Sequence, residues 1–465
     1  MYIKTEKCLI CTYVEQKEYK SLLTRLAEQE RKKLLLFVKN AENAFFHTFV
    51  LTFMHARDRI LKIKLKEKKE DTHMKITLKN ASVFSDGQFA KGNVSLHTGK
   101  AISVPSPLSD ASSLYVFPGF TDVHVHFREP GFSYKETIKT GSAAAAHGGY
   151  TAVCTMPNLN PTPDSLKNLT FQLDRIASSA SIRVLPFGSI TKGEEGKELS
   201  DMEALAPFVC GFSDDGRGVD NTALMREAME RAKVLNKVIS AHCEDGASPK
   251  DSPEAEWRQI ERDIKLVSDI GCKYHVCHIS TKESVALIRD AKASGVNITC
   301  ETAPHYLTLT DAMKEDSGNF RMNPPLRNSF DVLALIEGIT DGTVDMIATD
   351  HAPHSAEEKS RGFERSLNGV VGLETAFPVL YTALVDTGVI KLEKLIQLMS
   401  VAPNERFGIE SAGYTVYDLN AEYTVDAKDF FSMGKSSPFL HQRVRGKCVA
   451  TVLDGKAVYL NPEYL

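Results

Sequence analysis

Eight short apolar runs divide the middle of this 465-residue chain, and each run ends in polar residues. Longer stretches with helical character, such as residues 221–236 and 281–295, lie between the runs. A buried strand followed by a helix, repeated eight times, is typical of a closed barrel of parallel strands. The chain is therefore predicted to be an α/β protein in which residues 118–404 form a (β/α)8 TIM-type barrel. The runs occupy residues 120–127, 151–158, 182–190, 208–215, 237–245, 273–280, 297–305 and 345–354.

The two flanks of this barrel have a different pattern, in which apolar and polar residues alternate over short segments. The alternation begins at residue 74, and it returns after the helical stretches end at about residue 403. Such alternation is typical of half-buried β-strands. We expect residues 74–117 and 405–465 to form one small accessory β-sandwich domain.

Composition excludes several classes of protein. The formal net charge is −4, so no overall positive field favours nucleic acid as a partner. No segment reaches the roughly 20 apolar residues that a membrane helix needs, so no membrane association is expected. The nine cysteines are scattered, which favours reduced thiols over a disulfide framework and predicts a cytoplasmic protein.

Residues 1–73 differ from the rest, with 16 Lys and Arg against 10 Asp and Glu and a helical character. Two interpretations remain: an artefact of an upstream start in gene calling, or a real appendage that binds a partner. We favour the first, because residue 74 begins the strand pattern. The Cys8–Cys11 pair is a lone CxxC, and residues 12–73 offer no second pair for a zinc site.

Most of the conspicuous polar residues lie at the C-terminal ends of the runs, where barrel enzymes hold their active sites. A single histidine there is more often a surface or hydrogen-bonded residue than a ligand. Four histidines and two aspartates at one end of a barrel instead predict a metal site, with zinc favoured and manganese or cobalt as alternatives. Six ligands exceed the needs of one tetrahedral ion and favour two ions that share a carboxylate. The candidates are His124, His126, Asp214 or Asp215, His242, His278 and Asp350.

Arg128 lies two residues beyond His126, on the same face if the first strand continues. A guanidinium cannot bind a cation. We therefore interpret Arg128 as a residue that binds a substrate carboxylate through two hydrogen bonds, with a structural salt bridge as the alternative. Asn158 and Asn323 could complete an anion or amide pocket, although each could also be an ordinary turn residue.

The motifs carry a resemblance to a known family. In chain order they are DVHVHFREPG, MPNLNPTPD, FSDDG, AHCED, CHIST, ETAPHYL, RMNPPLR and ATDHAPH. As a set they resemble the class I dihydroorotases of the amidohydrolase superfamily. The resemblance implies a metal-dependent barrel that interconverts L-dihydroorotate and N-carbamoyl-L-aspartate in pyrimidine synthesis, with one or two Zn²⁺ ions per subunit.

The resemblance also implies a role for each matching residue. The implied metal ligands are His124, His126, Asp215, His242, His278 and Asp350, with Asp215 as the bridge and Asp350 also as the catalytic base. The implied substrate-binding residues are Arg128, Asn158, Asn323, His354 and Gly369. Residues 355–369 resemble the family's mobile loop, although Asn368 stands where many relatives have an aromatic residue.

Two other functions compete with this one. Hydantoinases and allantoinases bridge their metals with a carboxylated lysine, and the GFSDDG segment offers no lysine. A non-catalytic barrel that scaffolds aspartate carbamoyltransferase should have lost metal ligands, whereas this chain keeps all six. The resemblance further implies a homodimer and allows association with aspartate carbamoyltransferase.

Overall fold

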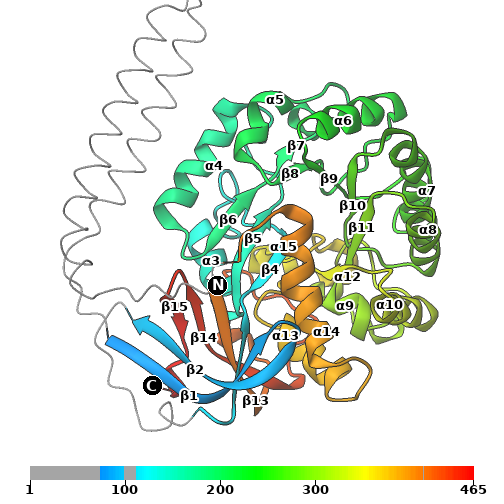
Figure 1. Ribbon diagram of the computed structural model, residues 1–465. Helices are drawn as coiled ribbons and strands as arrows, with labels where there is room; N and C mark the ends of the chain where they lie inside the picture. The colour runs from blue at the N-terminus through cyan, green and yellow to red at the C-terminus, as the bar shows by residue number, and fades with distance from the viewer. Residues whose placement is uncertain (1–73, 99–110, 412, 465) are drawn as a thin grey trace, which may run out of the picture. The chain divides into compact units, whose positions relative to one another are not determined.

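The computed structural model describes residues 74–98, 111–411 and 413–464 (Figure 1). The predictions for residues 1–73, including the Cys8–Cys11 pair, lie outside these residues. Each of the eight apolar runs contains a parallel strand, and the third run contains two short ones. The strands are β4 (Phe120–Val125), β5 (Tyr150–Thr155), β6 (Arg183–Pro186), β7 (Gly188–Ser189), β8 (Gly211–Ser213), β9 (Val238–Ala241), β10 (Lys273–Val276), β11 (Ile298–Thr302) and β12 (Met346–Ile347).

The runs join into one ring of strands. Strands β4, β5 and β6 form one parallel sheet, and β7 to β12 form a second. The Phe187 amide, between β6 and β7, donates to the Thr155 carbonyl at 2.9 Å and links the two sheets. At the other end, the His126 amide donates to the His351 carbonyl at 2.8 Å, just beyond β12. The predicted barrel is confirmed.

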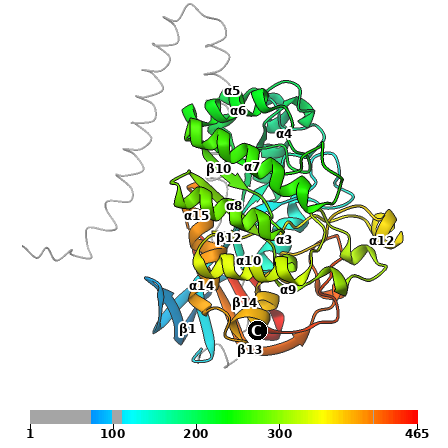
Figure 2. The same ribbon diagram turned by 90° about the vertical axis from the view of Figure 1, so that its right-hand side faces the viewer.

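Helices follow the strands and cover the outside of the ring. In Figure 2, α7, α8 and α10 lie one beside the next in front of the strands. Asn221, Ser252 and Thr281 cap α6, α7 and α8 by accepting from backbone amides of the first turn. The outer helices are α3 (Ile138–His147), α4 (Leu166–Ser179), α5 (Met202–Leu205), α6 (Thr222–Val234), α7 (Pro253–Ile270), α8 (Lys282–Ala293) and α10 (Ser329–Asp341).

Shorter helices lie in the segments between β11 and β13. They are α9 (Pro304–Thr308), α11 (Ala356–Lys359), α12 (Gly362–Arg365), α13 (Ala376–Leu380), α14 (Leu392–Ile396) and α15 (Ala402–Phe407). Among the described residues, none of the helices has the length and apolar character needed to cross a bilayer.

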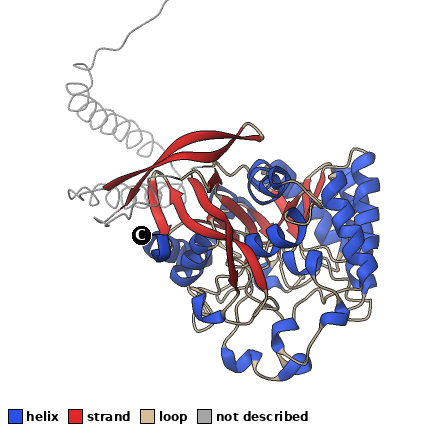
Figure 3. Cartoon of the chain, turned by 90° about the horizontal axis from the view of Figure 1, so that it is seen from below, coloured by secondary structure: helices blue, strands red, loops and turns tan. Residues whose placement is uncertain are grey.

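Six strands from both flanks form the accessory sheet (Figure 3). They close by hydrogen bonds into one small barrel in the order β1-β2-β15-β14-β13-β3, rather than forming two separate facing sheets. Asp-Gly turns with positive φ at both residues join β1 to β2 and β14 to β15, as tight hairpins require. The predicted domain boundaries stay a prediction. The strands are β1 (Met74–Ser85), β2 (Gln88–Thr98), β3 (Leu114–Pro118), β13 (Gly413–Thr424), β14 (Arg443–Leu453) and β15 (Lys456–Leu460).

Aromatic packing fixes this sheet against the large barrel. Phe117 on β3 stacks on Tyr417 of β13, with ring centroids 5.4 Å apart. Phe377 on α13 lies 4.2 Å from Tyr417 and 5.3 Å from Phe120 at the start of β4. All four rings are buried, so this contact stabilises the position of β4, which carries the first predicted metal ligands.

Candidate metal centre and active site

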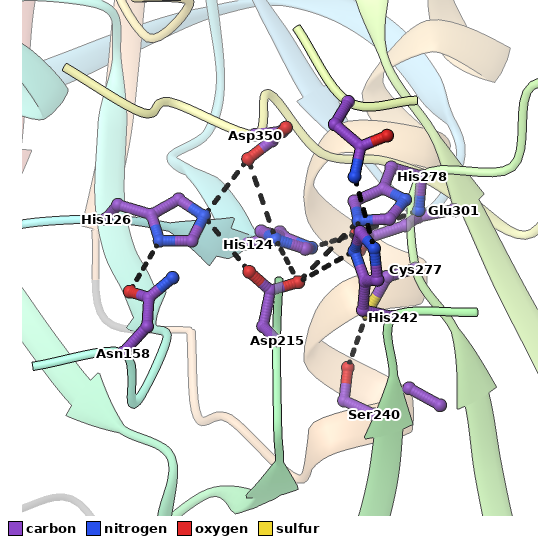
Figure 4. Close-up of polar contacts among 12 residues, drawn as sticks. His124, His126, Asn158, Asp215, Ser240, His242, Cys277, His278, Glu301 and Asp350 are labelled. Atoms are coloured by element: carbon purple, nitrogen blue, oxygen red, sulfur yellow. Dashed lines mark hydrogen bonds and ion pairs between the residues drawn. The ribbon is translucent and has the colours of Figure 1, made fainter. Parts of the chain in front are cut away.

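The C-terminal ends of five barrel strands bring the six predicted metal ligands together (Figure 4). Parallel strands present their carboxyl ends at one rim, so residues far apart in sequence meet there. His124 lies on β4, and the other five follow the ends of β4, β8, β9, β10 and β12: His126, Asp215, His242, His278 and Asp350. All six are buried.

Asp215 lies between two groups of histidines. Its Oδ1 is 3.1 Å from His124 Nε2, and its Oδ2 is 3.4 Å from His126 Nε2. The same Oδ1 is 3.6 Å from both His242 Nδ1 and His278 Nε2. Asp215 therefore belongs to two sets of three potential ligands, one with His124 and His126 and one with His242 and His278.

The neighbouring Asp214 points elsewhere. Its Oδ1 accepts from the amides of Ile190 at 2.7 Å and Thr191 at 3.0 Å, and its Oδ2 accepts from the Thr191 hydroxyl. These contacts hold the turn after β7. The structure therefore places only Asp215 among the histidines.

Asp350 lies on the other side of the first histidine pair. Its Oδ1 is 3.1 Å from His126 Nε2 and 3.6 Å from His124 Nε2. Burial raises its pKa, but the hydrogen bond with His126 and the charge of His124 outweigh burial and hold the pKa at about 2. Asp350 is therefore a carboxylate at neutral pH, able to bind a cation or to accept a proton.

The hydrogen bonds of the first histidine pair suit a bound cation. His124 Nδ1 donates to Glu301 Oε1 at 2.7 Å, and His126 Nδ1 donates to Asn158 Oδ1 at 3.0 Å. Nε2 of each ring then faces carboxylate oxygens, with a proton between them when no metal is bound and with its lone pair free for a cation when one is. The buried His124 Nε2 and Asp215 Oδ1 have no hydrogen-bond partner. A cation between them would satisfy both, so these residues fit a metal.

His242 has the opposite orientation. Its Nε2 donates to Glu244 Oε2 at 3.1 Å, which leaves Nδ1 free to face Asp215 and, at 2.9 Å, His278 Nε2. Two lone-pair nitrogens this close need a proton or a cation between them. Asn323 Nδ2 also donates to Glu244 Oε2, at 3.3 Å. Glu244 therefore orients His242 and holds Asn323 beside it.

The electrostatic balance of the cluster is negative. Burial lowers the pKa of His124, yet the charges of Asp215 and Glu301 raise it well above its ordinary value. For His242, the nearby carboxylates of Asp215, 3.6 Å away, and Glu244, which accepts its Nε2 proton, likewise outweigh burial and raise the pKa to about 9. Carboxylates that favour positive imidazoles to this degree also favour a divalent cation in their place.

Arg128 lies beside the cluster with a φ of 56°. Its Nε donates to the Pro353 carbonyl at 3.3 Å, which fixes the guanidinium next to the segment that follows Asp350. Burial lowers its pKa, while the charges of Asp350 and Asp215 oppose that effect. Within the described part of the chain Arg128 forms no ion pair with a carboxylate, so its terminal nitrogens are suited to an anionic ligand.

His354 and Gly369 lie together at the edge of the site. His354 Nε2 donates to the Asn368 carbonyl at 2.7 Å, and its Nδ1 accepts from Lys135 Nζ at 3.1 Å. Gly369 has a φ of 129°, and a Cβ there would lie 2.5 Å from the Ala352 carbonyl oxygen. Only glycine fits this position, which keeps the chain close to His354.

Segment 355–369 is anchored by a buried lysine. Lys359 Nζ donates to the carbonyls of Arg321, Leu367 and Gly369 at 3.0, 2.8 and 2.7 Å. The preceding residue, Glu358, forms an ion pair with Lys135 at 3.0 Å. These contacts hold the segment beside the site, and its mobility stays a prediction.

Known proteins match this chain over most of its length. A family model described as dihydro-orotase-like matches residues 114–256. The dihydroorotase of Fusobacterium nucleatum is 45% identical over 419 residues, covering 83% of this chain and 99% of that protein. The dihydroorotase of Ligilactobacillus salivarius is 42% identical over 432 residues, covering 84% of this chain and 100% of that protein. The chain belongs to the dihydroorotase family. It is accordingly a cyclic amide hydrolase, and its His and Asp cluster fits a metal cofactor.

Solved structures share the fold of this dihydroorotase family member. The L-hydantoinase from Arthrobacter aurescens superposes with a TM-score of 0.72 at 24% identity, over 82% of this chain and 95% of that chain. The dihydropyrimidinase from Brevibacillus agri NCHU1002 gives 0.71 at 20% identity, over 83% and 95%. At these identities the comparison supports the barrel fold alone.

Sequence reasoning missed three polar residues that contact the predicted site in this family member. Glu301 contacts His124, Glu244 contacts His242, and Lys135 contacts His354. For Glu301 a signal existed, since an acid inside a buried strand needs a partner. Lys135 lies in a loop and carried no comparable signal.

Proposed function

We propose that this chain catalyses the reversible hydrolysis of L-dihydroorotate to N-carbamoyl-L-aspartate in pyrimidine biosynthesis, using one or two Zn²⁺ ions. The observation that carries the proposal is the position of Asp215 between two pairs of buried histidines. Asp350 and Arg128 lie beside these histidines. The match to curated dihydroorotases along almost their whole length supports the same reaction.

The proposed ligands form two groups around Asp215. One group adds His124 and His126, the other adds His242 and His278, and Asp350 completes the first. Neutral imidazoles and carboxylates are the ligands that Zn²⁺ prefers. When bound, the metal supplies a Lewis acid that acidifies water and polarises the amide carbonyl of the substrate.

Asp350 is the proposed base. It accepts a proton from the water that attacks the ring carbonyl, and it then delivers that proton to the departing ring nitrogen. The carbonyl carbon gains the hydroxyl group as its bond to nitrogen breaks, so the water is fully consumed. The low pKa of Asp350 keeps it ionised at neutral pH, which is the form that can accept a proton.

Arg128 and Asn158 are the proposed binders of the substrate carboxylate. Asn158 uses its Oδ1 on His126 Nδ1, which leaves its Nδ2 as a donor. Arg128 offers the charge and the fork geometry that match a carboxylate. This pair would orient the ring and disfavour neutral cyclic amides, because an unpaired guanidinium would remain.

Asn323, His354 and Gly369 are the proposed contacts on the remaining side of the ring. His354 has both ring nitrogens engaged, with Asn368 and Lys135. A substrate would therefore have to exchange with one of these partners to contact His354. Gly369 contributes backbone, since a side chain there has no room.

The test is an assay of the purified full chain loaded with zinc. Ring opening of L-dihydroorotate is followed by ultraviolet absorbance, with and without a chelator, and beside the neutral cyclic amides hydantoin and dihydrouracil. We expect chelator-sensitive turnover of L-dihydroorotate and little turnover of the neutral compounds. Zinc-loaded protein that opens only the neutral rings would instead make the chain a hydantoinase-type enzyme.

Location and assembly belong to the same proposal. The scattered cysteines support a cytoplasmic location, and the resemblance supports a homodimer and allows association with aspartate carbamoyltransferase. Sedimentation of the purified chain, alone and with that enzyme, measures both kinds of assembly. A monomer in both samples would contradict the proposed assembly.

A further inference from the structure

We propose that Glu301 is a positioning residue that orients His124 and connects the two histidine groups of the metal centre. This inference rests on the proposed metal centre. Glu301 lies on β11, a barrel strand that supplies none of the six proposed ligands. It is buried, and so is His124. A charged side chain at such a place needs partners, and those of Glu301 are residues at or next to the centre.

The first contact fixes the tautomer of a ligand. Glu301 Oε1 accepts from His124 Nδ1 at 2.7 Å. The proton is thereby held on Nδ1, so Nε2 keeps the lone pair that faces Asp215. A carboxylate behind a histidine ligand also fixes the plane of the ring and increases the basicity of the ligating nitrogen.

The second contact reaches the other histidine group. The same Oε1 accepts from the backbone amide of His278 at 3.4 Å. One oxygen atom thus contacts a side chain of the first group and the main chain of the second. Glu301 therefore links the His124 side chain on β4 to the backbone that follows β10.

A third contact holds Glu301 itself. His275 Nε2 donates to Glu301 Oε2 at 3.1 Å, and His275 Nδ1 accepts from the Thr299 hydroxyl at 2.9 Å. His275 is completely buried, and its hydrogen bond with Glu301 is buried as well. The chain of contacts runs from Thr299 through His275 and Glu301 to Nδ1 of His124, and every polar side-chain atom along that path has a partner.

Cys277 offers a competing explanation, because its sulfur forms a third group of potential ligands with His124 and Glu301. The Cys277 thiol lies 3.1 Å from the Ser240 hydroxyl. Since the His124–Glu301 hydrogen bond already occupies Nδ1, this group orients His124 rather than binding a second metal.

The test compares two matched substitutions, Glu301→Gln and Glu374→Gln, in the full chain. Glu374 is the control, because its buried carboxylate also accepts from a histidine Nδ1, that of His147, at 2.6 Å. His147 belongs to neither histidine group. The zinc dissociation constant is measured by competition with a chromophoric chelator, and the melting temperature is measured on metal-free protein. We expect E301Q to bind zinc about 10–100-fold more weakly than the parent, and E374Q to match the parent.

A second variant covers the case in which E301Q does not fold. His275→Gln removes the partner behind Glu301 but keeps the contact with His124, so a smaller loss of zinc affinity is expected. Parent-like zinc affinity in E301Q, or in H275Q if E301Q is unfolded, would overturn the inference and leave the metal centre standing. A parent chain that binds no divalent cation would overturn both.

Discussion

The two adjacent aspartates after β8 provide a sharp test of the site, because Asp215→Asn should weaken metal binding whereas Asp214→Asn should leave it intact. Both side chains are buried, and both substitutions keep the shape. Asp215 faces four histidines, whereas Asp214 accepts from the Ile190 and Thr191 amides. Burial and chemistry are matched, so only the orientation of the two carboxylates differs.

Asp215→Asn should damage metal binding. It removes the negative charge whose oxygens lie 3.1–3.6 Å from the four histidine nitrogens. Loss of a partner behind a ligand costs about 10–100-fold in affinity, and loss of a shared ligand should cost more than about 100-fold. Turnover should decrease as the bound metal is lost.

Asp214→Asn should leave metal binding intact and change the pH dependence of stability. Burial outweighs the hydrogen bonds from Thr191 and Ile190 and raises the pKa of Asp214 from 3.8 to about 6. Such a shift corresponds to about 3 kcal/mol. Because the folded chain binds this proton more tightly than the unfolded chain does, the contribution is present below about pH 4 and lost as pH rises to about 6. Asparagine keeps an oxygen for the two amides, so D214N should be up to ~3 kcal/mol more stable than the parent at pH 7.

The assays are a chelator competition for zinc affinity and urea unfolding of chelator-treated protein between pH 4 and pH 7. We expect weak zinc binding in D215N alone, and a flatter stability profile in D214N alone. Equal loss of zinc affinity in both variants would refute the assignment of Asp215 as the shared ligand. An unchanged pH profile in D214N would refute the stability argument for Asp214.

Three further substitutions test the proposed roles around the centre. Asp350→Asn should lower kcat by about 10²–10⁴-fold, because the amide cannot accept the proton, and should leave substrate affinity within a few-fold; retained turnover would contradict its role as base. Lys135→Met removes the donor to His354 and should raise KM for L-dihydroorotate by about tenfold, equal to ~1.4 kcal/mol, with a smaller change in kcat; an unchanged KM would separate Lys135 from substrate binding. Gly369→Ala places a Cβ 2.5 Å from a backbone oxygen and should lower the free energy of unfolding by more than Gly342→Ala, since Gly342 also has a positive φ but no atom within 4 Å of its Cβ. Denaturant unfolding of both glycine variants measures the difference, and equal effects would show that the close contact costs nothing.

Much of the fold follows from patterns that are local in the sequence. Apolar residues recur with a different period in a strand than in a helix. Each of the eight runs, and each stretch between them, can therefore be assigned from its own residues. The parallel arrangement then places the ends of all runs at one rim, which is why residues such as His124, His242 and Asp350 can be grouped from the sequence alone. The alternation in both flanks indicated β-strands in the same way, but not that β1 to β3 and β13 to β15 close into one ring.

The partners of each site residue depend on how the ring closes, and local patterns do not contain that information. His124 and Glu301 are 177 residues apart in the sequence. They come into contact because both side chains, on β4 and β11, point into the interior of the large barrel. Asp214 and Asp215 are chemically identical neighbours, and only the direction of the chain after β8 turns one towards the histidines and the other towards Thr191. The sequence by itself determined which residue types gather at the rim, because strand order and strand ends are encoded in hydrophobic periodicity. The tertiary structure decided which atom of each residue faces which neighbour, because that depends on the register and closure of strands distant in the chain.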